Sequence, residues 1–308
     1  MPFGGSILLQ AGQARVAATR AGATDRPALV LLHGWPQSRA LYDGIVDELS
    51  DTFFVLAMDL PEVGDSRGAP PSAEKSALAD MLLTAAESAG ARDITIAGLD
   101  VGGMIAFAAA RDHGERISRA IVMNTVIPGL EPWETLLADP HVWHFAFHAI
   151  ADLPETLVRG RERAYFDFFH DALASDPAKI PDALRETFAL AYMRQEALEA
   201  GFDWYRAMAR DAERNASPKA ISTPMLYVRG NADGRSIDAY RNGLKAAGVA
   251  NLDTRVAAGA GELLPIEAPA AFIEIIRDFA LGVRTSDNAA DPRTLDDVSS
   301  TDAGRSGR

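Results

Sequence analysis

Strand-length apolar runs alternate with segments of helical spacing along most of this chain, and that alternation limits the fold more than any other feature. A continuous apolar run is typical of a strand that is buried on both faces of a parallel sheet. Residues 38–50 instead repeat apolar side chains at helical spacing after Ser38, a residue type that caps helices. Repeated strand, helix, strand units with short connections predict a doubly wound, mostly parallel α/β sheet. The strands are expected at residues 27–34, 52–60, 93–100, 119–124, 223–230 and 251–259, and the helices at residues 38–50, 74–89, 101–114, 235–247 and about 270–281.

The pattern also divides the chain. Residues 6–10 and 14–22 have the pattern of an antiparallel hairpin that precedes the parallel strands. Further along, strand patterns stop for almost ninety residues, and only helical, aromatic-rich segments occur there. A helical insertion into such a sheet predicts a cap over the carboxyl ends of the strands, where these folds bind ligands. We therefore expect a core of residues 1–128 and 217–282, a cap of residues 129–216, and a disordered tail of residues 283–308, which has few apolar residues and no aromatic one.

Composition excludes several functions. The formal net charge of −13 opposes binding to a phosphate backbone, so we expect no nucleic-acid partner. Without cysteine the chain has no disulfide, thiolate nucleophile or thiolate-bound metal. The N-terminus lacks a signal-peptide pattern, and no uncharged apolar run approaches the ~18–20 residues of a membrane span. These features predict a cytoplasmic protein without a membrane segment, and they fit a monomer or a homodimer.

Asp100 stands in the sequence IAGLDVGG, at the junction of an expected strand and an expected helix. Glycines at positions 98 and 102 allow a sharp turn with close approach of strand and helix, which exposes the central side chain above the sheet. A carboxylate in that place can attack carbon and form an ester with the protein. The alternative is that Asp100 only caps the following helix, which aspartate does well.

A second turn favours the catalytic interpretation. The sequence LLHGWPQS follows an expected buried strand and aims the backbone N–H of Trp35 toward the space above Asp100. Together with the N–H of Val101, it would supply two donors to a carboxylate oxygen that gains negative charge in an addition intermediate. We expect His33, beside this turn, to have a structural role.

These motifs resemble the α/β-hydrolase superfamily, and within it the epoxide hydrolases and the haloalkane or haloacid dehalogenases that use an aspartate nucleophile. The resemblance covers about residues 10–282 and includes the cap sequences WHFAFHAIADLPETLVRGRERAYFDFF and AGFDWYRA. It implies an α/β-hydrolase fold with Asp100 as the nucleophile and the backbone of Trp35 and Val101 as the donors.

The resemblance extends to the cap. Tyr205, in DWYR, matches the tyrosine that donates a proton or hydrogen bond to the epoxide oxygen, and Trp143 stands where a partner tyrosine is expected. An indole N–H can donate a hydrogen bond but cannot deliver a proton. His144 resembles a halide-pocket position of haloacid dehalogenases. The aromatic content of the cap predicts a small-molecule substrate that is apolar or aromatic.

One part of the family pattern is missing. The resemblance implies a histidine after the last strand, paired with an acid, that hydrolyses the ester intermediate. Glu262 stands in that place, and no histidine follows residue 170. The relay acid is expected 24 residues after Asp100, but that position holds Asn124. Asp233 in RGNADG occupies a second possible relay position.

Three interpretations of Glu262 are open. It can be a tolerated polar residue in a protein that lost activity and only binds a ligand. It can replace the histidine as general base, since burial beside Asp100 would raise the pKa of one carboxyl of the pair, and a neutral Asn124 can orient it. It can also act with Asp100 and Tyr205 in proton transfer during an isomerisation, elimination or cyclisation. We expect epoxide opening in preference to dehalogenation, because Tyr205 suits an oxygen leaving group.

No motif for a cofactor is present. The sequence has no phosphate-binding glycine loop and no paired-histidine metalloprotease motif. His141, His144 and His148 recur at helical spacing and could bind a metal, but the pattern supplies no acidic ligand nearby. We therefore expect neither a metal nor an organic cofactor.

Overall fold

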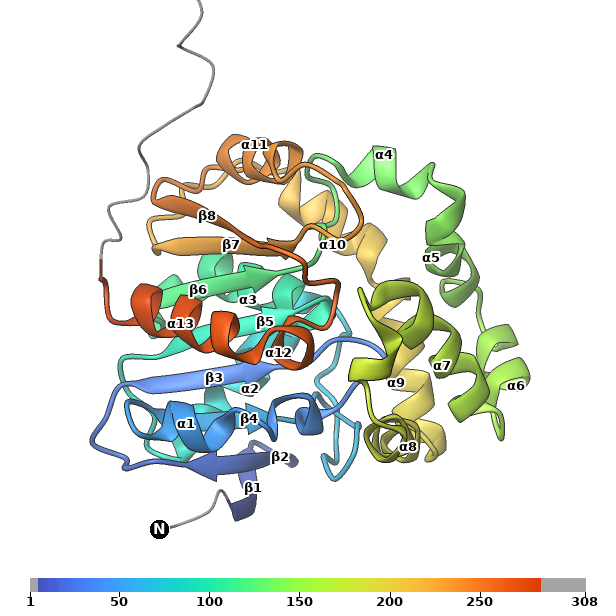
Figure 1. The fold of residues 1–308 in the computed structure, drawn as a ribbon, viewed down its shortest axis with the longest axis horizontal. Helices are drawn as coiled ribbons and strands as arrows, with labels where there is room; N and C mark the ends of the chain where they lie inside the picture. Colours follow the sequence, from blue (N-terminus) through green and yellow to red (C-terminus); the bar gives the residue numbers. More distant parts are fainter. Residues whose placement is uncertain (1–4, 284–308) are drawn as a thin grey trace, which may run out of the picture.

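A single mixed sheet forms the centre of the molecule (Figure 1). In the computed structural model, which describes residues 5–283, eight strands lie in the order β1-β2-β4-β3-β5-β6-β7-β8. β2 pairs antiparallel with β1 and β4, and all the other pairs are parallel. The predicted fold class and the opening hairpin are therefore confirmed. The strands are β1 (Gly5–Ala11), β2 (Ala14–Ala21), β3 (Ala28–Leu32), β4 (Phe54–Met58), β5 (Thr95–Leu99), β6 (Arg119–Met123), β7 (Met225–Gly230) and β8 (Leu252–Ala257).

Helices cover both faces of this sheet. The side chains of β3 show the two layers, because alternate residues of a strand point to opposite faces. Ala28, Val30 and Leu32 join the core on the side of α2 (Lys75–Ser88) and α3 (Val101–Asp112). Leu29 and Leu31 join the core on the side of α1, α12 and α13, which are Val46–Ser50, Leu264–Glu267 and Pro269–Ala280. All five side chains are fully buried, as a continuous apolar run predicts.

The helix predicted over residues 38–50 is wrong in its continuity. A 3-10 turn, η1 (Arg39–Tyr42), and the short helix α1 replace it, and Ser38 makes no side-chain cap. The backbone N–H of Arg39 instead donates to Asp59 at 2.9 Å. Gly44, a poor helix former, lies in the break. The apolar positions at both ends of the segment are nevertheless buried.

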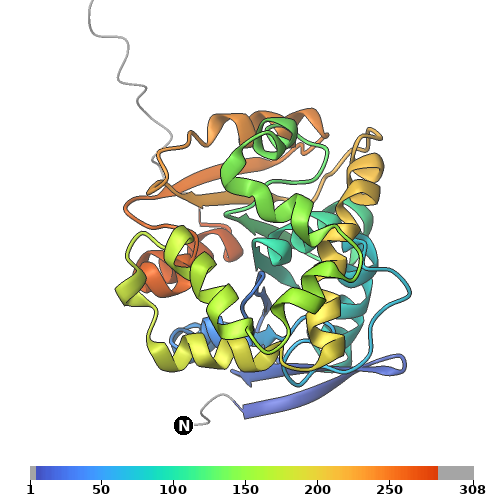
Figure 2. The ribbon, with the colours of Figure 1, turned by 90° about the vertical axis from the view of Figure 1, so that its right-hand side faces the viewer.

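A block of helices is inserted between β6 and β7 and lies over the carboxyl ends of the parallel strands (Figures 1 and 2). This arrangement is the predicted cap, whereas its boundaries at residues 129 and 216 stay predictions. After the insertion, α11 (Asp238–Ala246) connects β7 to β8. The inserted helices are α4 (Trp133–Leu137), η3 (Pro140–Val142), α5 (Trp143–His148), α6 (Leu153–Val158), α7 (Glu162–Leu173), η4 (Pro177–Lys179), α8 (Asp182–Ala191), α9 (Gln195–Arg206) and α10 (Met208–Asn215).

A buried ion pair ties the cap to the core. Nζ of Lys75, at the start of α2, lies 2.9 Å from Oδ2 of Asp211 in α10, and both side chains are almost fully buried. The same ammonium donates to the carbonyl of Trp204 in α9. Removing one partner of such a pair leaves an uncompensated buried charge, at a cost of about 3–5 kcal/mol. The pair therefore holds α9 and α10 firmly against the core.

Two other sequence predictions concern membrane segments and the C-terminal tail. Within residues 5–283 the helices are too short or too polar to cross a bilayer. Beyond Val283, the tail predicted to be disordered lies outside the described residues.

Candidate active site

Asp100 lies at the sharp turn between β5 and α3. Its backbone adopts φ 51° and ψ −121°, a conformation that side-chain-bearing residues rarely adopt. Glycines make the turn feasible, because a Cβ on Gly98 would lie 1.9 Å from the carbonyl oxygen of Gly102, and a Cβ on Gly102 would lie 2.4 Å from that of Leu32. The strand and helix thus approach too closely for any side chain, and the turn presents Asp100 above the carboxyl end of the sheet.

Backbone donors surround the Asp100 carboxylate. The N–H of Trp35 donates to Oδ2 at 2.8 Å, and the N–H of Val101 is a second hydrogen-bond donor. Burial raises the pKa of Asp100 to about 6, although these donors and the charge of Lys75 lower it. The structure thus places both N–H groups where the turn motifs predict them, and Asp100 is ionised above about pH 6.

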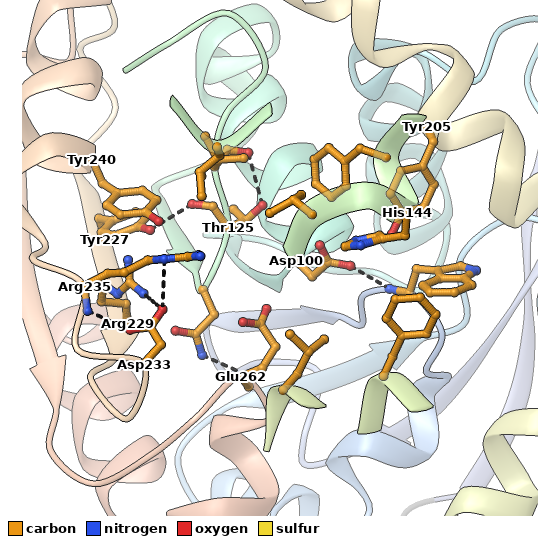
Figure 3. A pocket seen from close by; sticks show the side chains of 18 residues that line it. Asp100, Thr125, His144, Tyr205, Tyr227, Arg229, Asp233, Arg235, Tyr240 and Glu262 are labelled. Carbon is orange, nitrogen blue, oxygen red and sulfur yellow. Dashed lines mark hydrogen bonds and ion pairs between the residues drawn. The ribbon is translucent and has the colours of Figure 1, made fainter. Parts of the chain in front are cut away.

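Glu262 lies in the loop between β8 and α12 and faces the same cavity as Asp100 (Figure 3). Its carboxyl makes no hydrogen bond with the described part of the chain. Burial raises its pKa well above the ordinary value and the charge of Asp100 raises it further, while Arg229 lowers it. Of the two facing carboxyls, Asp100 is held by N–H donors and Glu262 by none. Glu262 is therefore the group that keeps its proton when Asp100 is ionised.

Asn124 makes no hydrogen bond to the Glu262 carboxyl, which differs from the orienting role that the general-base interpretation gave it. Its side-chain amide donates to the main-chain carbonyls of Gly261, at 3.1 Å, and Glu262, at 2.8 Å. Its Oδ1 accepts from the N–H of Gly230 at 2.8 Å. The amide is thus occupied by backbone groups, and it joins the end of β6 to the last residue of β7 and to the loop after β8. The N–H of Glu262 donates to Leu173 of the cap at 3.0 Å, which fixes the same loop from the other side.

Asp233 lies at the edge of the cavity, 42% exposed, and belongs to an ion-pair network. Its Oδ2 is 2.5 Å from Nη2 of Arg229 and 3.8 Å from Nε of Arg235. It makes no hydrogen bond to Glu262 within the described residues, although its charge contributes to the raised pKa of Glu262. The geometry therefore does not join Asp233 to Glu262 as a relay pair.

Two predicted cap residues line the cavity, and one does not. Tyr205 is buried and His144 is partly buried, and both side chains face the cavity. Burial raises the pKa of Tyr205 well above 10 and lowers the pKa of His144 to about 4, so both are neutral near pH 7. Trp143 is 43% exposed and packs against Phe168 on the outside of the cap. Neighbouring helical residues point in different directions, so His144 takes the inward position and Trp143 the outward one.

The cavity has a volume of about 120 Å³ and two chemically different ends. Apolar and aromatic side chains, among them Phe145, Phe169 and Leu173, line it together with the polar groups. Figure 3 shows Asp100, His144 and Tyr205 at one end, Arg229, Asp233 and Arg235 at the other, and Glu262 between them.

Sequence reasoning missed Arg229 and Lys75. Arg229 is the only charged residue in the apolar run that forms β7, and that position was a usable signal. Lys75 carried no signal, because its buried partner Asp211 lies 136 residues away. Two of the helical histidines lie together, since the rings of His144 and His148 are 5.5 Å apart between centroids, whereas His141 pairs with Asp139. Among residues 5–283, no three metal-binding side chains come together.

Comparison with known proteins agrees with this architecture. The chain matches the alpha/beta hydrolase fold family over residues 27–267 and belongs to that family. The soluble epoxide hydrolase of Corynebacterium sp. (strain C12) is 28% identical over 195 residues, which are 61% of this chain and 67% of that protein. The pimeloyl-(acyl-carrier protein) methyl ester esterase of Nitrosospira multiformis is 27% identical over 212 residues, 67% of this chain and 77% of that protein. These two relatives are an epoxide hydrolase and an ester hydrolase.

Solved structures resemble the chain over most of its length. Cfl2 from Burkholderia cenocepacia superposes with a TM-score of 0.80 at 29% identity, covering 89% of this chain and 95% of that one. The epoxide hydrolase CorEH superposes with a TM-score of 0.79 at 21% identity, covering 91% and 99%. The latter likeness supports the fold alone.

Proposed function

We propose that this protein is a hydrolase that opens an epoxide through an ester intermediate on Asp100, with Glu262 as both acid and base. One observation carries the proposal: the Asp100 carboxylate, held by two backbone N–H groups, faces the Glu262 carboxyl, which keeps its proton and receives no hydrogen bond from residues 5–283. Two carboxyls whose environments separate their pKa values are suited to opposite roles.

In the first step, the Asp100 carboxylate attacks a ring carbon and the carbon–oxygen bond of the epoxide breaks. Oδ2 stays with the N–H of Trp35, so Oδ1 is the attacking atom. The electron pair of the broken bond goes to the epoxide oxygen, which takes the proton of Glu262. The hydroxyl of Tyr205 and a ring N–H of neutral His144 donate hydrogen bonds to that oxygen as its charge develops.

In the second step, Glu262 is a carboxylate and takes a proton from water. The water oxygen attacks Cγ of Asp100, and the N–H groups of Trp35 and Val101 stabilise the oxyanion. The ester bond then breaks, and its oxygen takes the proton from Glu262 to release a diol. The acid left on Asp100 returns its proton to Glu262. The net reaction is addition of water to the epoxide, and Glu262 alternates between acid and base.

An oxygen-isotope experiment tests this sequence. With enzyme in excess over styrene oxide in H₂¹⁸O, a single turnover should give unlabelled diol and put ¹⁸O into the peptide that contains Asp100, because the diol receives its oxygen from Oδ1. Label in the diol instead would mean direct attack by water. A rearranged product without diol would favour the isomerase, cyclase or lyase alternative, and the absence of any product would favour a protein that only binds.

A further inference from the structure

The end of the cavity opposite Asp100 has no part in the proposed reaction. It is formed by the last residue positions of β7 and the loop that follows, and two arginines line it. Arg229 is 6% exposed, which is unusual for a guanidinium. Its charge lies over the ring of Tyr240, 4.6 Å from the ring centroid. Such a desolvated cation in a small cavity suggests a role in ligand binding.

The donors of Arg229 exceed its partners among residues 5–283. A guanidinium has five N–H donors in a planar fork. Nε donates to the carbonyl of Gly230 at 3.1 Å, Nη2 binds Asp233, and the hydroxyl of Tyr240 is a further hydrogen-bond partner. Three partners leave donors for an oxygen in the cavity.

Arg235 lines the same end of the cavity but is more exposed than Arg229. Its Nη2 donates to Asp139 of the cap at 2.6 Å, and its Nε lies 3.8 Å from Asp233. The side chain is 40% exposed, so it lies where the cavity opens. Asp233 and Asp139 balance the two guanidinium charges. The arginines therefore offer directed N–H donors more than a net positive potential, which suits a neutral carbonyl as well as a carboxylate.

We propose that the substrate carries an acceptor oxygen group, a carbonyl or carboxylate, that Arg229 and Arg235 bind while its reacting carbon lies at Asp100. This inference rests on the proposed function for the reacting end and adds the chemistry of the other end. The substrate is then an epoxide with an apolar middle and a polar terminus, which adds a polar group to the apolar or aromatic molecule expected from the cap aromatics.

The competing explanation is structural. In that case the network of Arg235, Asp139 and Asp233 only holds the loop after β7 against the cap. A structural role would change stability without distinguishing between ligands, whereas a binding role makes the loss depend on the acceptor group of the ligand.

Matched ligands separate the two explanations. The substrates are 3-phenylglycidate, 3-phenylglycidamide and trans-β-methylstyrene oxide, which share the phenyl epoxide and differ in the terminal group. Their unreactive counterparts are cinnamate, cinnamamide and trans-β-methylstyrene, whose binding to Asp100→Asn protein is measured by calorimetry. The variants are Arg235→Met and the milder Arg229→Lys, each checked for folding by circular dichroism. Arg116→Met is the control, because Arg116 precedes β6 and lies at the opposite end of the sheet.

We expect kcat/KM for the glycidate or the glycidamide to exceed that for methylstyrene oxide by at least about tenfold. A tenfold ratio corresponds to about 1.4 kcal/mol, roughly the contribution of one added hydrogen bond. Each of the two cavity variants, Arg235→Met and Arg229→Lys, should reduce that ratio to below about threefold, and Arg116→Met should leave it unchanged. A higher kcat/KM for the glycidate would identify the acceptor group as a carboxylate, and a higher value for the glycidamide would identify it as a carbonyl. An equal preference in the parent protein, or a ratio unchanged in both cavity variants, would overturn the proposal.

If no epoxide reacts, the binding of the three unreactive ligands still tests the acceptor site. If cinnamate or cinnamamide binds at least about tenfold more tightly than methylstyrene and loses that advantage in Arg235→Met, the acceptor site stands and the hydrolase proposal fails. If the three unreactive ligands bind alike, the acceptor site is contradicted.

Discussion

The side chain of Asn124 donates a 2.8 Å hydrogen bond to the main-chain carbonyl of Glu262 and makes no hydrogen bond to its carboxyl. The same amide nitrogen also donates to the main-chain carbonyl of Gly261 at 3.1 Å. Asn124 therefore fixes the position of the loop, whereas the protonation of Glu262 depends on burial and on the charge of Asp100. Asn124 thus clamps backbone groups, and the Glu262 carboxyl has no hydrogen-bond partner among residues 5–283.

The Asn124 clamp makes Asn124→Asp unfavourable. A carboxylate would face two carbonyl oxygens without a proton to donate, so we expect the free energy of unfolding to fall by about 2 kcal/mol, as for buried groups left unsatisfied. Urea denaturation measures it. Asn251→Asp is the matched control, because exposed Asn251 makes one amide donation, to Ser222, and should lose under about 1 kcal/mol. Equal losses in the two variants would refute the clamp.

The pair of carboxyls predicts a bell-shaped pH dependence of kcat/KM. Activity should rise as pH increases through about 6, because Asp100 must be ionised to attack. It should fall at higher pH, where Glu262, whose pKa burial raises, loses the proton it must donate. The two apparent values belong to the coupled pair. Glu262→Gln should abolish the alkaline limb of the residual activity, and an alkaline limb that persists would assign it to another group.

Glu262→Gln should also change the pH dependence of stability. Because the pKa of Glu262 is higher in the folded than in the unfolded chain, the folded state binds the proton more tightly. Stability of the parent protein therefore falls as pH rises above the unfolded pKa of about 4.5. A glutamine mimics the protonated acid and lacks this loss. The Tm of the variant minus that of the parent should increase from pH 5 to pH 8; a constant difference would mean that Glu262 ionises normally.

Tyr205→Phe tests the group that faces the leaving oxygen. Loss of one donor to a developing oxyanion lowers kcat by about 10²-fold or more, and His144 still donates in this variant. Phe168→Leu is the control, since Phe168 is 52% exposed on the cap and should change kcat less than about twofold. Steady-state kinetics with styrene oxide measures both. A Tyr205→Phe protein as active as the control would remove Tyr205 from the proposed mechanism.

The centre of the sheet was predictable because its inner strands are apolar runs of the right length. β3 and β4 are buried at every position, and such runs carry their own signal. The continuity of the helix after Ser38 was not predictable from apolar spacing, because a hydrogen bond from Arg39 to Asp59 and a glycine in the middle of the segment interrupt it. Spacing identifies the buried face without saying whether one helix or two supply it.

The site was predictable where it is local. The turn sequences around Trp35 and Asp100 determine a short backbone path, and the hydrogen bond between them follows from it. The rest depends on packing between distant segments. The rotation of α5 decides that His144 rather than Trp143 faces the cavity. The partners of Asn124 come from the end of β7 and the loop after β8, more than a hundred residues away. Neither relationship has a signature in sequence.

Intact-protein mass spectrometry after mixing with styrene oxide or 3-phenylglycidamide tests the central claim most directly. Glutamine at position 262 can still donate a hydrogen bond in ring opening but cannot take a proton from water, so Glu262→Gln should accumulate an adduct of one epoxide per chain. The parent protein should show diol with little adduct, and Asp100→Asn should show neither. Diol formation by Glu262→Gln at the parent rate, or an adduct of equal yield on Asp100→Asn, would contradict attack by Asp100 and hydrolysis by Glu262.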